Sequence, residues 1–97
     1  MSASLSTHVL DTARGRAAAG VRVELYLGEK LLVMRETGDD GRIANLADDL
    51  ERGRYRLVFR PPSDFFLRVE VELRIDVGHY HVPLLVSPFG CTIYRGS

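Results

Sequence analysis

The sequence has few cysteines and no long apolar run. The first shortage excludes a protein held together by internal disulfides, and the second excludes a protein that crosses a membrane by an apolar helix. Among its 97 residues Cys91 is the only cysteine, so an internal disulfide is excluded and a reducing compartment, the cytoplasm, is expected. No apolar run approaches the roughly 20 residues that cross a bilayer. The first residues also lack the basic start and apolar stretch of a signal peptide. No membrane partner is therefore expected.

The sequence also has no excess of either charge. Thirteen basic and thirteen acidic residues give a formal net charge of zero. Domains that bind nucleic acid usually carry a basic face, so no nucleic-acid partner is expected. The arginines alternate with Glu and Asp, which predicts cross-strand ion pairs instead of a basic patch. Neither a nucleotide-binding glycine loop nor a Ser-His-Asp signature occurs, and no organic cofactor is expected.

Apolar and polar residues alternate along much of the chain. The clearest examples are residues 69–77, where Val, Val, Leu, Ile and Val alternate with charged residues, and residues 21–27. A half-buried strand places every second side chain on its core face, whereas a helix would scatter them. We count about eight short strands at spacings of roughly ten residues, typical of an all-β antiparallel sandwich or barrel. Residues 45–52 are expected to form at most one or two helical turns, and residues 1–97 are expected to form a single domain.

The C-terminal stretch, residues 79–97, contains two histidines two residues apart. In an extended strand His79, His81 and Pro83 share one face. The opposite face carries the apolar residues that a core needs, namely Tyr80, Val82, Leu84 and Val86. Packing alone does not favour imidazoles on the non-core face, so we interpret them as part of a site. Pro83 cannot donate a backbone hydrogen bond and predicts an edge or a bulge.

Each candidate residue also has an ordinary structural interpretation. A single strand histidine such as His8 is more often a surface residue, and Arg42 after a turn is more often simply solvated. A His-x-His pair can form half of a metal site, for which His8 and Cys91 would be the remaining ligands. Cys91 needs an activating partner to act as a nucleophile, and a small half-buried residue is the simpler interpretation. The last four residues, 94–97, would ordinarily be a frayed terminus.

Five short motifs carry a resemblance to a known family. They are T-H-V-L-D at 7–11, D-G-R at 40–42, H-Y-H-V-P-L-L at 79–85, S-P-F-G at 87–90 and Y-R-G-S at 94–97. Together they resemble the transthyretin-like family, and in particular its enzyme branch, the 5-hydroxyisourate hydrolases. The terminal Y-R-G-S is the most specific mark of that branch, because the hormone-carrying transthyretins lack it. The resemblance covers essentially the whole chain.

The resemblance implies a fold, an assembly and a reaction. The fold is a transthyretin-like (prealbumin-like) sandwich of seven to eight strands, and the assembly is a homotetramer, a dimer of dimers with active sites where the dimers meet. The substrate is 5-hydroxyisourate, made from urate in purine breakdown, and water opens one of its ring amides without a metal or other cofactor. The family's catalytic residues match His8, Arg42, His81 and Ser97. The substrate-binding positions match His79, Tyr94, Arg95 and Gly96.

The sequence departs from the family pattern in several places. Ala17 stands where the family has Pro, Cys91 where it has Tyr, and Ile93 where it has Thr. A short helix of the family, ahead of the Phe65-Phe66 pair, is missing. Two other functions remain open: a non-enzymatic small-molecule-binding module on the same sandwich, and a metal-dependent hydrolase built on His79 and His81.

Overall fold

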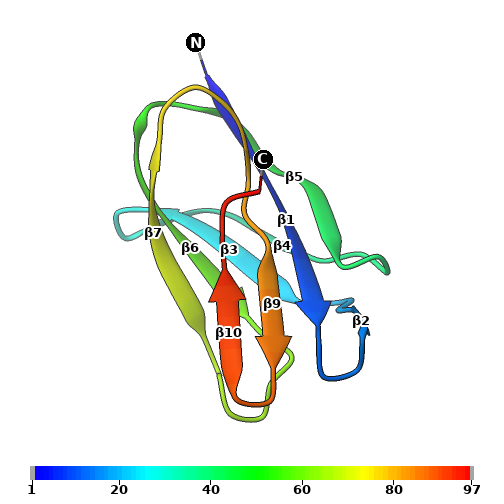
Figure 1. Ribbon diagram of the computed structural model, residues 1–97. Coiled ribbons are helices and arrows are strands. Elements are labelled where there is room, and N and C mark those ends of the chain that lie inside the picture. The colour runs from blue at the N-terminus through cyan, green and yellow to red at the C-terminus, as the bar shows by residue number, and fades with distance from the viewer. Residues whose placement is uncertain (1, 97) are drawn as a thin grey trace.

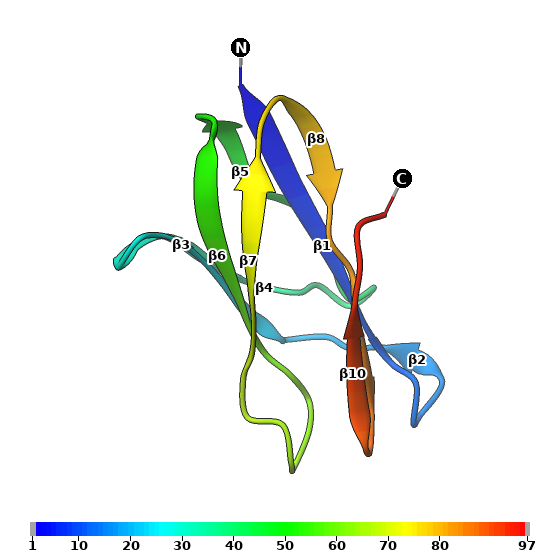
Figure 2. The same ribbon diagram turned by 60° about the vertical axis from the view of Figure 1, so that its left-hand side comes forward.

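The computed structural model describes residues 2–96, and it places them in two packed β-sheets without a helix. The strands are β1 (Ala3–Asp11), β2 (Arg16–Ala17), β3 (Arg22–Leu27), β4 (Lys30–Glu36), β5 (Arg42–Leu50), β6 (Gly53–Arg60), β7 (Val69–Ile75), β8 (Gly78–His81), β9 (Leu84–Ser87) and β10 (Gly90–Ile93). Figures 1 and 2 show β6 and β7 in one layer and β1, β9 and β10 in the other. The predicted all-β sandwich is confirmed.

Strand β1 is the centre of the six-stranded sheet. It pairs antiparallel with β5 and β2 and parallel with β8 and β9, and β10 pairs antiparallel with β9. The second sheet is antiparallel throughout, in the order β4-β3-β6-β7. The two parallel pairs were not predicted. Within residues 2–96 there are ten strands instead of seven or eight, because the two-residue β2 counts as a strand and the 78–87 segment is split.

The split between β8 and β9 lies at Pro83, where an irregularity was predicted. Both halves pair with β1. In the described residues β9 also pairs with β10, whereas β8 has on its other side only the isolated bridge between His81 and Gly96, so the proline lies where an edge strand ends. Val82 N–H donates to Ser6 O at 3.0 Å, and Thr7 Oγ1 donates to Val82 O at 2.6 Å. The carbonyl of Pro83 accepts from Tyr94 N at 3.4 Å. The terminal stretch therefore forms three strands in the described residues, β8, β9 and β10.

The core lies between the sheets and follows the predicted alternation. Its completely buried members include Leu5 and Val9 of β1, Leu25 of β3 and Leu57 of β6. In the C-terminal stretch Val82, Leu84 and Val86 are buried, and Tyr80 packs against the core, as predicted for that face. Burial of these side chains is the main favourable contribution to folding.

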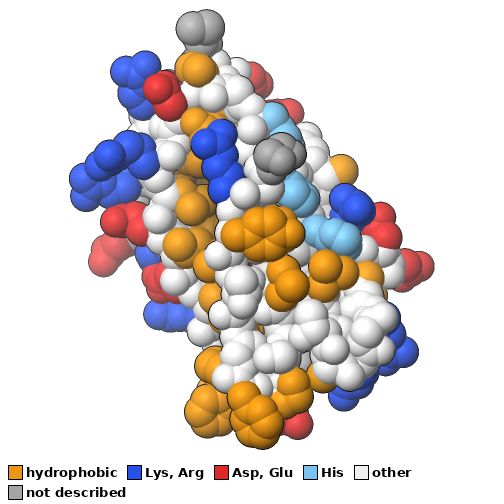
Figure 3. Space-filling model, viewed as in Figure 1, with side chains coloured by type: hydrophobic (Ala, Val, Ile, Leu, Met, Phe, Trp, Pro, Cys, Tyr) orange, Lys and Arg blue, Asp and Glu red, His pale blue; other side chains and the backbone are white. Residues whose placement is uncertain are grey.

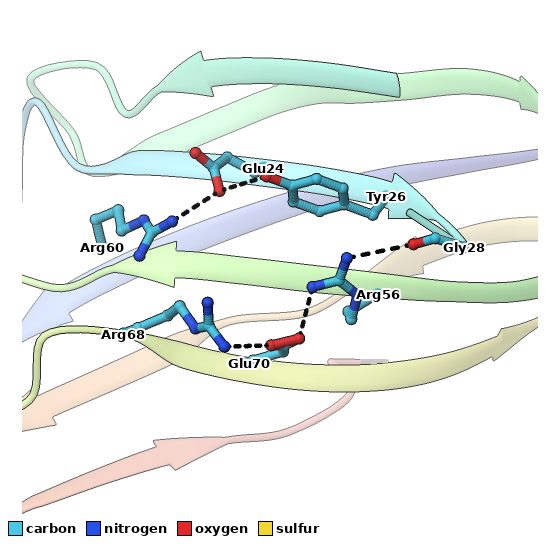
Figure 4. Close-up of polar contacts among 7 residues, drawn as sticks. All are labelled: Glu24, Tyr26, Gly28, Arg56, Arg60, Arg68 and Glu70. Atoms are coloured by element: carbon cyan, nitrogen blue, oxygen red, sulfur yellow. Dashed lines mark hydrogen bonds and ion pairs between the residues drawn. The ribbon is translucent and has the colours of Figure 1, made fainter. Parts of the chain in front are cut away.

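Ion pairs cover the outer face of the second sheet, as the charge alternation predicted (Figure 4). Arg56 Nη1 lies 2.8 Å from Glu70 Oε1 across β6 and β7, and Arg60 Nη2 lies 3.3 Å from Glu24 Oε1 across β6 and β3. The Glu24 side chain is only 2% exposed, and Arg22 Nε contacts it at 2.7 Å. A carboxylate buried to this degree is stable only with such partners.

Residues 45–52, which were expected to form at most one or two helical turns, form none. Residues 45–50 continue β5, because the backbone pairs with β1 at Ala3↔Leu50 and Leu5↔Ala47, and register shifts accommodate the polar residues. The loop at 61–68 joins β6 to β7 without a helix, as the departure of this segment from the family pattern predicted. In residues 2–96 no helix is long and apolar enough to span a membrane.

Candidate active site

The pairing of β1 with its neighbours gathers the predicted polar residues on one outer face. Because β1 buries Leu5, Thr7 and Val9, its even-numbered residues face away from the core. The β1–β8 register sets Ser4 opposite His79 and Ser6 opposite His81, and the β1–β5 register sets His8 opposite Arg42. Figure 3 shows the three histidines in an oblique row on this face.

Two serine hydroxyls connect the histidines of β8. Ser4 Oγ lies 2.7 Å from His79 Nδ1, and Ser6 Oγ lies 2.8 Å from His79 Nε2. Ser6 Oγ also lies 2.8 Å from His81 Nδ1. Both ring nitrogens of His79 and one of His81 are thus held by hydroxyl groups. Ser4 and Ser6 were not predicted as site residues, although they precede His8 by four and two residues and therefore lie on the same face of β1 as His8.

The turn before β5 orients both His8 and Arg42. His8 Nε2 lies 2.9 Å from the carbonyl oxygen of Asp40, which can only accept, so Nε2 carries the hydrogen and Nδ1 of the neutral ring is the lone-pair nitrogen. The Asp40 side chain accepts from Arg42 N at 2.9 Å. Gly41 has a φ of 76° and its carbonyl accepts from Val9 N at 2.8 Å. The D-G-R motif therefore forms a turn that holds the His8 ring and places Arg42 opposite His8 across β1 and β5.

The C-terminal tail is docked against β8 up to Gly96. Gly96 N–H donates to His81 O at 2.7 Å, and the Arg95 guanidinium stacks 4.5 Å above the Tyr80 ring. A Cβ atom at position 96 would lie 2.8 Å from His81 Cδ2, so any residue other than glycine would require the His81 ring or the tail to shift. The frayed-terminus interpretation is therefore wrong for residues 94–96. Ser97 lies outside the described residues.

The surroundings of His81 lower its pKa. Partial burial is the largest cause, followed by the nearby positive charge of Arg42 and by His8 and His79. The ring therefore remains neutral at neutral pH, and a neutral imidazole can accept a proton. Within residues 2–96 no hydrogen bond of His81 Nε2 is found, and this nitrogen adjoins Cδ2, the ring carbon nearest Gly96.

Cys91 does not belong to this cluster. It packs against the core, and burial raises the pKa of its thiol, which keeps it protonated. This agrees with the interpretation of Cys91 as a small half-buried residue. Across residues 2–96 no group of three or more His, Cys, Asp or Glu side chains is arranged to hold a metal ion.

The fold and this face together define a small β-sandwich protein with three imidazoles and a guanidinium gathered on one outer face. Imidazoles move protons near neutral pH, and a guanidinium binds planar anions and stabilises developing negative charge. The chain belongs to the HIUase/Transthyretin family, whose family model matches residues 5–96. Proteins named 5-hydroxyisourate hydrolase and proteins named transthyretin are both similar to it.

The 5-hydroxyisourate hydrolase of Deinococcus radiodurans is 44% identical over 114 aligned positions, which cover 96% of this chain and 95% of that protein. The solved 5-hydroxyisourate hydrolase of Klebsiella pneumoniae superposes with a TM-score of 0.90 at 35% identity, covering 98% of this chain and 99% of that one. Transthyretin from Sparus aurata superposes with a TM-score of 0.85 at 25% identity, covering 96% of both chains. The Deinococcus alignment exceeds this chain's 97 residues by 17 positions, so that relative contains segments missing here.

Proposed function

We propose that this protein is a hydrolase that opens a ring amide of 5-hydroxyisourate, yielding 2-oxo-4-hydroxy-4-carboxy-5-ureidoimidazoline in urate breakdown. The observation that carries the proposal is the outer-face cluster, in which β1, β5 and β8 bring His8, Arg42 and His81 together beside the docked tail. Two relatives named 5-hydroxyisourate hydrolase, at 44% and 35% identity over nearly the whole chain, support the same reaction.

In this reaction His81 is the general base. Its lowered pKa keeps the imidazole neutral, and Nε2 accepts a proton from water as the water oxygen attacks the amide carbon. Arg42, exposed beside His8, binds the planar substrate and stabilises the negative charge that develops on the carbonyl oxygen. His8 helps to position the substrate, and the hydrogen bond from its Nε2 to the Asp40 carbonyl holds its ring in place. No metal or organic cofactor takes part in these steps.

The tail closes the site in this proposal. Gly96 fixes the backbone against His81, Arg95 is held on Tyr80, and Tyr94 shapes the adjoining surface. Ser97 follows directly in the sequence, and its hydroxyl orients the attacking water in this proposal. His79, two residues before His81 on β8, contributes to substrate binding on the same face.

The proposal includes a homotetramer, a dimer of dimers, whose second dimer supplies the other wall of the site. The supporting observation is that Arg42 and His79 are exposed on a single chain, whereas hydrolytic sites usually exclude bulk water. The whole chain, residues 1–97, forms one domain in this proposal. We place it in the cytoplasm because its single thiol suits a reducing compartment.

The direct test follows the ultraviolet absorbance of freshly generated 5-hydroxyisourate with and without the protein. We expect accelerated decay, and a loss of roughly 100-fold or more in His81→Ala, the usual scale for removing a general acid or base. Arg52→Ala is the matched control, since that side chain is 77% exposed and pairs with Asp76. A spontaneous decay rate in the presence of the wild-type protein would refute the proposed function. Loss of activity on adding a chelator would support the metal-dependent alternative.

The tail is tested separately by adding residues after Ser97. We expect turnover to be abolished with little change in stability, because a terminal segment contributes little to the core. A matched extension before Met1 is the control and leaves activity intact. Full activity of the C-terminally extended protein would show that the tail has no role in the reaction.

The likeness to Sparus aurata transthyretin favours a binding module as the second candidate. The two functions differ in one measurable respect. A binding module would hold a small molecule without consuming it, so calorimetry would detect saturation while the absorbance of 5-hydroxyisourate decayed only spontaneously.

A further inference from the structure

The Ser6 hydroxyl connects two imidazoles that the reaction uses differently. Ser6 Oγ lies 2.8 Å from His79 Nε2 and 2.8 Å from His81 Nδ1, and Ser6 is 7% exposed. A hydroxyl has a single hydrogen, so it donates to one ring and accepts from the other. The direction of the two hydrogen bonds is therefore coupled to the tautomers of both histidines.

If His81 is the base, only one direction of the two Ser6 hydrogen bonds is possible. If Nε2 of His81 holds the lone pair, Nδ1 carries the hydrogen and donates to Ser6 Oγ. Ser6 must then donate to His79 Nε2, and His79 Nδ1–H donates to Ser4 Oγ, 2.7 Å away. Every ring nitrogen along the path has a matching partner in this arrangement, and it leaves only Nε2 of His81 available to substrate.

We propose that Ser6 and His79 are positioning residues that form a proton relay behind His81, an inference that rests on the proposed hydrolysis. As the water oxygen bonds to the amide carbon, one water O–H bond breaks and its proton binds His81 Nε2. The Nδ1 proton of His81 passes to Ser6 Oγ, and the Ser6 proton passes to His79 Nε2. The positive charge then resides on His79, and the relay runs back when the ring C–N bond breaks and Nε2 protonates the departing nitrogen.

The charges around the two rings explain why the relay helps. His81 is half-buried, its pKa is lowered by burial, Arg42, His8 and His79, and no acid is among the groups that shift it. A second positive charge is costly in that position. On His79 both N–H groups of an imidazolium have a hydroxyl oxygen to donate to, Ser4 Oγ at 2.7 Å and Ser6 Oγ at 2.8 Å. Moving the positive charge from His81 across the Ser6 hydroxyl to His79 therefore lowers the energy of the intermediate without moving any heavy atom.

The kinetic test compares Ser6→Ala and His79→Gln with the wild type, using Ser87→Ala as the matched control. Ser87 lies on the same sheet, and its hydroxyl donates to Gly90 O without contacting a histidine. We expect kcat to fall about tenfold or more in both relay variants, with KM unchanged in Ser6→Ala, and Ser6→Thr to restore most of kcat. In mixtures of H2O and D2O the wild-type rate should curve with deuterium fraction, since several protons move together, and should become linear in His79→Gln. Wild-type kcat in Ser6→Ala, or a curved dependence retained in His79→Gln, would overturn the relay.

A second measurement needs no substrate and separates this inference from the proposed function. In the free protein, ¹⁵N NMR should find neutral His81 protonated at Nδ1 and a change in that tautomer in Ser6→Ala. His81 protonated at Nε2 in the wild type would overturn the relay even if hydrolysis were observed. Absence of hydrolysis together with the expected tautomer would overturn the proposed function alone.

Discussion

Gly96 occupies a position where no other residue fits without movement. The space that a methyl group would take is already filled by the His81 ring, 2.8 Å from the ideal Cβ position to Cδ2. Because the Gly96 amide also donates to the His81 carbonyl, the tail backbone and the proposed base are held in one fixed relation. The glycine of the Y-R-G-S motif therefore has a steric explanation.

Gly96→Ala is expected to displace the tail or tilt the His81 ring. A displacement of about 1 Å at a reacting group can reduce activity on the order of 100-fold. Folding stability should hardly change, since the core is untouched, and thermal unfolding measures this alongside the absorbance assay. Gly90→Ala is the control, because its Cβ would meet only Ser87 Oγ at an ordinary 3.6 Å. An active Gly96→Ala enzyme would show that close contact with His81 is unimportant.

Arg42→Gln tests the electrostatics of the site. Burial and the Arg42 charge both lower the pKa of His81, so removing the charge should raise that pKa. A base must be neutral to act, and activity is lost as pH falls through its pKa, so the acidic limb of kcat/KM should move to higher pH. NMR titration of the His81 ring measures the shift directly, with Arg52→Gln as the control. A pKa of His81 that stays constant or falls would contradict this explanation.

The turn that leads into β5 is the element that places Arg42. At Gly41 the φ of 76° disfavours side chains, and a Cβ there would lie 2.5 Å from Val9 O and 3.0 Å from the Ala17 Cβ. The clash is with backbone on β1, which cannot move without disturbing the central strand. Stability and the site therefore depend on the same glycine.

Gly41→Ala is expected to lower the free energy of unfolding by about 1–3 kcal/mol from backbone strain alone, with the clash adding to it. Urea denaturation gives the value. Gly38→Ala in the same turn is the control, since its nearest neighbour, Asp40 Oδ1, lies 3.5 Å away and its φ is not in the left-handed region. Equal stabilities for the two variants would show that the turn relaxes freely around position 41.

Period-two alternation predicted most strands and the core face of the C-terminal stretch, because burial acts locally on every second side chain. Strand pairing depends on partners distant in sequence, so the parallel contacts of β1 with β8 and β9 were not predicted. For the same reason the continuation of β5 through residues 45–50 was missed, since its pairing with β1 overrides a polar local sequence. His8, Arg42 and His81 were identified by resemblance, whereas Ser4 and Ser6 emerged only from the register.

At the scale of the whole molecule the two sheets leave unpaired edges and an exposed polar face. Within the described residues β7 pairs only with β6, and β10 pairs only with β9. Open edges carry free backbone donors and acceptors, which a second copy of the chain can satisfy. The proposed tetramer would use these edges and enclose the histidine face.

Light scattering at micromolar concentration should therefore give about four times the 10.9 kDa chain mass. Dilution that dissociates the tetramer should reduce specific activity in parallel, because each site loses its second wall. Arg52→Ala, at an exposed site, serves as a mass and activity control. A monomer with full activity would refute the shared-site assembly.

The long sequence separation across the site has a consequence for synthesis on the ribosome. Ser6 and His81, which share a hydrogen bond, are separated by 75 residues, and β1 can reach β8 only after nearly the entire chain has emerged. Contacts so distant in sequence form late, since the intervening chain must first lose its freedom. No shortened nascent chain can therefore be active, and refolding should restore catalysis and the sandwich with one shared rate constant.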